Sequence, residues 1–317
     1  MKFSLHVTGL ELIINITPEL YADLRNYGYS NREIAMEIGI PQSTLSKKIS
    51  TWFRNGLLLD YYNVYLDKLM YPIEVCILVF NQRISIESVI YKKHPLTVYF
   101  SPIPKPTYFI YRRIYFEDHY MNYSFYKNNY KDVYRVILCS VVEKTLIPRE
   151  EYVNSKIELN YNDDSCINSS YIIDEYDQYL AETLFKYYNP PISVKGSVVI
   201  SKELTSMMRD SLYRNHYYRH LRNKLVKKRI IVRDLTKLEY SILLVYTNSL
   251  SKLIDIIYTL HNREIIGGVD QVNFISTEPV IALIHSWINR DKYWRHEVNH
   301  EYFSETRYDI YLIKQII

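Results

Sequence analysis

The sequence predicts an α+β fold in which two winged helix-turn-helix domains alternate with two ferredoxin-like βαββαβ domains. The first observation behind this is a repeat, because residues 215–246 carry the apolar skeleton of the second half of residues 31–80, about 172 residues further on. The matched apolar residues are Ile49 with Leu221, Phe53 with Leu225, and Leu58 with Ile230. The second observation is that each copy runs on into strand-like and helix-like segments in the same order.

That order is strand, helix, strand, strand, helix, strand. In the first half we expect strands at 73–80, 96–103, 106–116 and 132–142 with helices at 84–94 and 117–130, and in the second half strands at 238–247, 264–276, 279–288 and 307–317 with helices at 249–262 and 289–303. The predicted segments are therefore a winged helix-turn-helix at 1–66, a βαββαβ domain at 67–146, a polar linker at 147–171, a degenerate winged helix-turn-helix at 172–236 and a second βαββαβ domain at 237–317.

Capping signals predict the three helices of the first unit. Thr17 is placed to cap the first helix, with Pro18 at its first turn. Ser30 and Glu33 have the spacing of a capping box for the second helix, and Gly39 supplies the turn to the third. The apolar residues expected in the core of this unit are Ile34, Ala35, Ile38, Leu45, Ile49, Trp52 and Phe53.

Polar side chains remain on the exposed part of the third helix, where a recognition helix contacts base edges and phosphates. The DNA-binding residues predicted from this unit are Ser30, Asn31, Gln42, Ser43, Thr44, Ser46, Lys47, Lys48 and Arg54. An ordinary three-helix packing unit with polar outer residues is the alternative interpretation.

The second copy is less regular but more basic. Between Arg209 and Arg233 the chain holds nine Lys or Arg residues and two histidines, with Asp210 as the only acid. Lys and Arg at a recognition helix neutralise phosphates, whereas a solvated helix face is the usual alternative for such a run. The DNA-binding residues predicted here are Arg214, His216, Arg219, Arg222, Lys224, Lys227 and Lys228.

Composition limits the class of protein. The chain has 317 residues, 48% of them apolar, and a net charge of +4, so any nucleic-acid binding has to come from local charge. No run of apolar residues is long enough to span a membrane, and residues 1–20 do not match a secretory signal. Three scattered cysteines argue against a disulfide framework or a zinc finger and indicate a reducing compartment.

No enzyme motif is found. Phosphate-binding glycine loops, the GxSxG pattern, the HExxH pattern and the deaminase pattern are all absent from the sequence. His296 and His300 are spaced four apart on a predicted helix, but a pair without a third ligand is more often solvated surface. We therefore expect no enzymatic activity, no cofactor and no metal.

The arrangement of a helix-turn-helix, a short connection at 56–72 and a βαββαβ domain resembles the leucine-responsive regulator (Lrp/AsnC) family of prokaryotic and archaeal transcription factors. The resemblance covers residues 17–143 well and residues 172–317 in element order. It implies DNA binding by the N-terminal domain, and pairing and amino-acid sensing by the C-terminal domain. The turn SPIPKPTY departs from the family's glycine-and-aspartate turn, and Gly267, Gly268 and Asp270 stand near the start of a strand instead.

Together these features predict a transcriptional regulator that binds double-stranded DNA and is cytoplasmic and nucleoid-associated. The βαββαβ sheets are expected to pair within the chain or in a homodimer, with a small-molecule effector as a further partner. An architectural, chromatin-organising or partition protein is the alternative, and an adaptor whose helix-turn-helix domains bind protein is a third interpretation.

Overall fold

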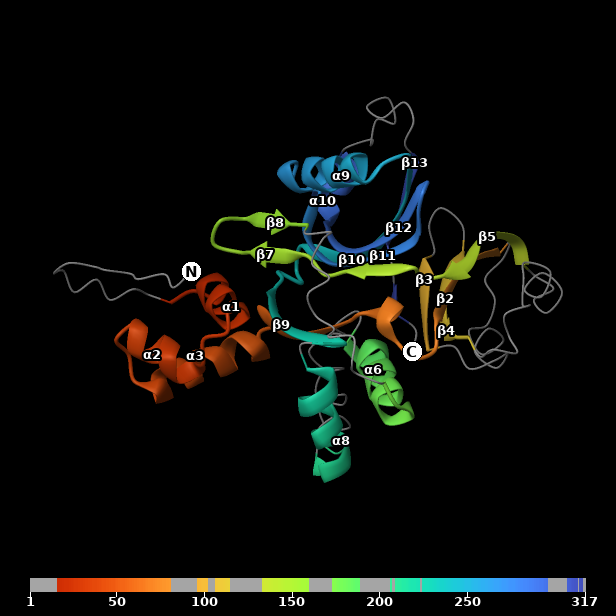
Figure 1. Cartoon of the computed structure of the whole chain (residues 1–317). Coiled ribbons are helices and arrows are strands. Elements are labelled where there is room, and N and C mark those ends of the chain that lie inside the picture. Colours follow the sequence, from red (N-terminus) through yellow and green to blue (C-terminus); the bar gives the residue numbers. More distant parts are fainter. Residues whose placement is uncertain are drawn as a thin grey trace.

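A computed structural model describes residues 16–80, 96–101, 106–114, 133–159, 173–188, 206, 209–222, 224–295, 307–312 and 314–315. The fold is mixed α+β, with two five-stranded sheets packed near each other, three helices at the N-terminal end, and α6 and α8 on a separate side (Figure 1). The helices expected at 84–94 and 117–130 lie outside the described residues. Among the residues that are described, no helix is long and apolar enough to cross a membrane.

The three N-terminal helices are confirmed as predicted: α1 (Pro18–Asn26), α2 (Asn31–Glu37) and α3 (Gln42–Arg54). The Thr17 hydroxyl accepts a hydrogen bond from the N–H of Leu20, and Ser30 and Glu33 form the reciprocal capping box. The buried residues that pack these helices together are Tyr21, Ala22, Ile34, Ala35, Leu45 and Ile49. The positive φ of Gly39, +69°, makes the turn that residues with a Cβ adopt at a cost.

After α3 the chain enters β1 (Leu58–Val64), which pairs antiparallel with β9 (Val226–Val232). Leu59 faces Ile231 in this pair, and the offset between these two residues is the one that relates the two copies of the repeat. Equivalent strands of the two halves therefore pair with each other across a pseudo-two-fold axis.

Among the described residues, the long recognition helix expected in the second winged helix-turn-helix is not formed, which corrects the expected fold. The helix expected to continue through the basic run is short: α8 (Ser211–His216) passes into a π-helical turn, η3 (Tyr217–Leu221), and the chain then enters β9. Lys227 and Lys228 consequently lie on a strand. The reason is local, because the β-branched residues of VKKRIIV suit a strand that is buried against β1.

Two five-stranded sheets make up most of the rest. The first has the order β14-β3-β4-β2-β5, made of β14 (Lys314–Gln315), β3 (Thr97–Ser101), β4 (Thr107–Arg113), β2 (Ile73–Phe80) and β5 (Val133–Val141). The second has the order β13-β10-β12-β11-β6, made of β13 (Arg307–Leu312), β10 (Leu238–Thr247), β12 (Val280–Asn289), β11 (Ile266–Thr277) and β6 (Lys144–Leu146). The four strands that each half contributes to its own sheet lie in the antiparallel order typical of ferredoxin-like domains, as the sequence predicts.

Each half also lends a short strand to the sheet of the other half. β6 follows β5 in the first half but pairs with β11, and β14 belongs to the second half but pairs with β3. The expected helix at 249–262 is present as α9 (Leu250–Asn262), which packs on the outer face of the second sheet through Leu253, Ile256, Ile257 and Leu260. A short helix, α10 (Arg290–Arg295), follows β12.

The inner faces of the two sheets share one buried core with β1, α6 and η3. Tyr111 of β4 and His285 of β12 meet across it, with the phenol oxygen 2.9 Å from Nε2. The Tyr240 hydroxyl lies 2.5 Å from Nδ1 of the same ring. Burial lowers the pKa of His285 from its usual 6.5 to about 3, so this ring is neutral in the folded protein.

The first part of the expected linker is folded against the body of the protein. It forms a hairpin of β7 (Arg149–Glu151) and β8 (Lys156–Glu158), and the N–H groups of Tyr152 and Val153 donate to the Asp23 carboxylate at 2.9 and 3.0 Å. This joins the linker to α1. The remainder of the expected linker, 160–171, lies outside the described residues.

A buried ion cluster closes the junction between this hairpin, β9 and β11. The Arg233 guanidinium, which is fully buried, lies 2.8 Å from Glu150 and 3.0 Å from Asp270. Burial alone would raise the pKa of the Glu150 carboxyl, but Arg233 and Arg229 outweigh it and the pKa is lowered. Removing one member of such a cluster should strongly destabilise the fold, because it leaves the opposite charge buried and unpaired.

Candidate metal centre

Four side chains that could bind a metal ion meet between α6 (Glu175–Tyr188) and the α8–η3 helix. They are Asp174, Asp177, His216 and His220. One ligand atom from each lies within 4.8 Å of all the others. We refer to these four residues as the Asp–His cluster.

The start of α6 fixes the two carboxylates. Asp174 caps the helix, since its Oδ1 accepts the N–H of Asp177 at 2.9 Å and its own N–H donates to Asp177 Oδ2 at 3.3 Å. Asp177 lies on the apolar face of α6, because Leu180 and Leu184, three and seven residues further along the helix, pack into the shared core. Asp177 is fully buried as a result, and its carboxylate has few ways to move.

The α8–η3 helix places the two histidines one turn apart. Its Asp210 cap accepts the N–H of Leu212 at 2.8 Å, and Tyr217 and Leu221 anchor the other face in the shared core. Residues four apart on a helix lie on one face, so both rings point to the same side. The ring centroids of His216 and His220 are 5.0 Å apart.

Distances within the Asp–His cluster match a tetrahedral metal site. Nδ1 of His216 lies 2.9 Å from Asp177 Oδ1 and 3.5 Å from Asp174 Oδ1, and Nδ1 of His220 lies 3.2 Å from Asp177 Oδ2. Bonds of about 2.0–2.2 Å to zinc in a tetrahedron put neighbouring ligand atoms roughly 3.3–3.6 Å apart. These three distances match that spacing to within a few tenths of an ångström, and the other distances between ligand atoms are at most 4.8 Å.

The exposure of the side chains in the Asp–His cluster increases from the interior to the surface. The side chain of Asp177 is 0% exposed, that of His216 is 12% exposed and that of Asp174 is 46% exposed. Two carboxylates and two neutral imidazoles carry a charge of minus two, which a divalent cation neutralises. Without a cation, the alternative is that each histidine simply donates a hydrogen bond to Asp177 and fastens the two helices together.

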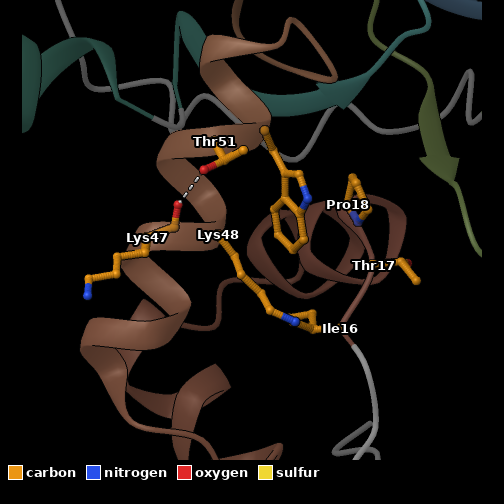
Figure 2. Close-up of a pocket in the computed structure, with 7 residues that line it drawn as sticks. Ile16, Thr17, Pro18, Lys47, Lys48 and Thr51 are labelled. Atoms are coloured by element: carbon orange, nitrogen blue, oxygen red, sulfur yellow. Dashed lines mark hydrogen bonds between the residues drawn. The ribbon is translucent and has the colours of Figure 1, made fainter.

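The DNA-binding residues predicted from the first unit lie at the N-terminus of α2 and along α3. Ser30 is occupied as a helix cap, and Asn31 accepts a hydrogen bond from the Tyr21 hydroxyl at 3.1 Å. Lys47 and Lys48 line a shallow hollow of about 480 Å³ with Thr51, Trp52 and residues 16–18 (Figure 2). The residues on the remaining exposed surface are Gln42, Ser43, Thr44, Ser46 and Arg54.

The residues predicted from the second unit do not share one surface. His216 points inward to Asp177, and Lys228 pairs with Asp60 at 3.2 Å on the β1–β9 sheet. Lys224 donates to the carbonyl of Arg219 at 3.1 Å. The other predicted residues lie on three different elements. Arg214 is in α8, Arg219 is in η3 with Arg222 directly after it, and Lys227 is in β9.

The sequence contains a signal for the Asp–His cluster that the prediction did not use. His216 and His220 have the four-residue spacing of a helical ligand pair, and Asp174 and Asp177 have the spacing of a helix start. Nothing in the sequence indicates that these two pairs meet, because they are about 40 residues apart and α6 and α8 are brought together by the shared core. The pair considered from the sequence, His296 and His300, lies outside the described residues.

No family model matches the sequence, and no curated protein matches it. Solved structures similar to the chain include the crystal structure of the siroheme decarboxylase NirDL and that of the same enzyme in co-complex with an iron-uroporphyrin III analogue. Each has a TM-score of 0.42 and 11% sequence identity to this chain. Each match covers 90% of this chain and 85% of the enzyme's chain. A likeness of this size carries no activity or ligand over to this chain.

These comparisons correct the functional prediction. No family model and no curated protein supports a transcription factor, and the similar structures named above are of an enzyme. The predicted Lrp/AsnC-like regulator is therefore corrected, and so is double-stranded DNA as its partner. Nucleoid association was expected because of DNA binding, so it is no longer supported. Nothing supports the expectation that the chain is not an enzyme. The physical error lies in the basic run between Arg209 and Arg233, where Arg229 and Arg233 are buried and His216 faces Asp177 instead of solvent.

Proposed function

We propose that this protein binds one divalent transition-metal ion, with zinc the best match, at the Asp–His cluster. The observation that carries the proposal is the convergence of four ligand atoms within 4.8 Å, around a carboxylate that is fully buried. Buried charges are normally paired or coordinate metals, and here the groups nearest to Asp177 are themselves metal ligands.

The types of ligand favour a transition metal over calcium or magnesium. Imidazole nitrogen suits zinc, iron, copper and nickel, whereas calcium and magnesium take oxygen ligands. Two imidazoles and two carboxylates with tetrahedral spacing suit zinc best, because zinc accepts both ligand types and four-coordinate geometry. Two hard carboxylates and no thiolate make a copper(I) ion a poor match.

The position of the site supports a role in fixing structure. Residues 189–210 separate α6 from α8 in the sequence, and one ion would join the two helices directly. A cross-link that closes a long loop stabilises the folded state by restricting the unfolded chain. Because η3 leads into β9, the ion would also stabilise the junction at which the two halves meet.

Metal titration of matched variants tests the proposal. Metal-free protein is titrated with zinc against a chelating dye, using the intact chain, His216→Gln, His220→Gln, Asp177→Asn and the control His261→Gln. His261 is a helix histidine outside the cluster, with Nε2 2.9 Å from the carbonyl of Ser155. The intact chain and the control should bind one equivalent, and the three cluster variants should bind at least about 100-fold more weakly.

Two results would oppose the proposal. If the intact chain takes up no zinc, iron(II), manganese(II), cobalt(II) or nickel(II) in such titrations, the cluster serves only to pack two helices. If it takes up an ion but the glutamine variants bind equally well, the site is elsewhere. Circular dichroism of each variant shows whether it remains folded, so that loss of the site and loss of the fold are distinguished.

Two parts of the predicted architecture stay predictions. We propose that α1–α3 and β1 form one winged-helix unit. The separate hydrophobic core that the three helices form with β1 supports this. The domain boundaries predicted at 66, 146, 171 and 236 are tested by limited proteolysis, since cleavage concentrates at exposed backbone with few hydrogen bonds.

A further inference from the structure

Two cysteines stand directly opposite each other in the first sheet. β2 and β5 pair antiparallel, and Cys76 and Cys139 are partners in the register. Directly opposite residues in an antiparallel pair project from the same face of the sheet. Cys76 is buried in a small core on that face, Cys139 packs against it half-buried, and both are thiols.

The geometry is compatible with a disulfide bond. Opposite residues in an antiparallel pair have Cα atoms about 4.5 or 5.5 Å apart, and disulfides span Cα separations of about 4.4–6.8 Å. The two sulfur atoms lie within 4.8 Å of each other. A modest change in side-chain torsions, with no slip of the strands, would bring them to bonding distance.

Glu74 also lies within 4.8 Å of both sulfur atoms, so a metal site is the alternative. Its carboxylate, however, is paired with the buried guanidinium of Arg112. A fixed positive charge at this place opposes a cation, and it already uses the carboxylate that a metal would need. The Cys139 thiol donates to the other oxygen of Glu74 at 3.3 Å. The surroundings therefore favour sulfur chemistry over metal binding.

We propose that Cys76 and Cys139 are a redox-sensitive dithiol that closes to a disulfide when hydrogen peroxide oxidises the protein. Cys139 is the more accessible sulfur and reacts first. Its sulfur bonds to one peroxide oxygen as the O–O bond breaks, which gives a sulfenic acid and one water. The sulfur of Cys76 then attacks the Cys139 sulfur, the S–O bond breaks, and the hydroxide takes the Cys76 proton to form a second water. Two thiols have then lost two electrons and two protons, and the peroxide has gained them.

The disulfide would join β5, an edge strand, to β2 beside it. β5 pairs with β2 through a register with irregularities at Ile77/Leu78 and Val79/Phe80, and a covalent bond at Cys76 would fix the regular part of the ladder. Oxidation should therefore protect β5 from proteolysis and raise the melting temperature of the protein.

The full chain carrying Cys166→Ser tests this proposal, because that substitution leaves only the two cysteines in question. The protein is treated with hydrogen peroxide, denatured, alkylated with N-ethylmaleimide and analysed by intact mass and peptide mapping, with and without dithiothreitol. We expect the loss of both reactive thiols, a mass lower by two hydrogens, and a linked pair of peptides that contain residues 76 and 139. Dithiothreitol should restore both thiols.

Three results would overturn the proposal: both thiols remaining alkylatable after peroxide, a sulfinic or sulfonic acid on Cys139 with Cys76 intact, or a dimer linked between chains through Cys139. The matched variant Cys76→Ser with Cys166→Ser keeps Cys139 alone. It should accumulate oxidised sulfur on Cys139 or link between chains under the same treatment. This result would show that Cys76 is what captures the oxidised Cys139 in the Cys166→Ser protein. The central readout is a peptide link in the Cys166→Ser protein, so it does not depend on whether the Cys76 variant folds.

Discussion

Nδ1 of His216 lies 2.9 Å from Oδ1 of Asp177, although the two residues are 39 positions apart in the sequence. The contact depends on two separate helices that the shared core brings together, since Leu184 of α6 and Leu221 of η3 are both fully or almost fully buried in it. A side chain expected at a DNA surface is therefore directed into the protein, where it lies among other side chains of the types that bind metal ions.

The two adjacent glycines of β11 should differ sharply in their tolerance of a methyl group. A Cβ at Gly268 would overlap the guanidinium of Arg233 and lie 2.6 Å from Oε1 of Glu150. At Gly267 it would meet only the methyl groups of Leu238, at 2.8 Å, which can rotate away. Because a disturbed buried ion cluster leaves charges uncompensated, Gly268→Ala should cost about 3–5 kcal/mol and Gly267→Ala about 1 kcal/mol or less. Urea unfolding measures both, and equal losses would show that the cluster is not rigid.

Stability should depend on pH through His285. Burial holds the pKa of this ring at about 3 in the folded protein, against 6.5 when it is exposed in the unfolded chain. Between these values the unfolded chain binds the additional proton, so the stabilisation is complete above pH 6.5 and is lost as pH falls towards 3. One proton corresponds to about 1.4 kcal/mol per pH unit.

The variant His285→Gln isolates this effect, because glutamine keeps hydrogen-bonding groups near Tyr111 and Tyr240 but does not titrate. At pH 7 the variant should be less stable than the parent, and the gap should narrow by about 1.4 kcal/mol per unit as pH falls below 6.5. Urea midpoints at several pH values between 7 and 4.5 provide the measurement. Parallel curves for the two proteins would mean that the ring is charged or exposed in the fold.

Ser30 offers a test of how much helix capping contributes to stability. It is the cap of α2 and accepts the N–H of Glu33 at 3.2 Å. Ser30→Ala should lower stability by about 1 kcal/mol, whereas Ser30→Asp should retain it, because aspartate caps helices as well as serine does. Thermal unfolding of the two variants checks this. Equal stability of the alanine variant and the parent would show that the cap contributes nothing to the folded state.

Much of the fold follows from local sequence signals. The capping box at Ser30 and Glu33, the apolar spacing of α9 and the alternation of strands are all properties of short windows, and all are present in the structure. The end of the helix at Leu221 was missed because a basic run with apolar spacing resembles a recognition helix. The strand that follows is decided by its partner β1, which lies far away in the sequence.

The site could not be predicted in the same way. Asp177 and His216 each look like solvated helix residues in their own windows, and only the packing of α6 on η3 makes them neighbours. The buried cluster of Arg233, Glu150 and Asp270 has the same origin, since it joins a hairpin in the expected linker to two distant strands. A charged residue in a window gives no sign of whether it will be exposed or paired in the interior.

Metal binding by the Asp–His cluster is tested most directly by the zinc-dependent stability of paired histidine variants. Thermal unfolding is followed with and without zinc at about 100 times its dissociation constant, where a single site adds about 2.7 kcal/mol. We predict that zinc raises the melting temperature of the intact chain and of His261→Gln, and leaves that of His216→Gln with His220→Gln unchanged. An equal shift in all three proteins, or no shift in the intact chain, would contradict the account.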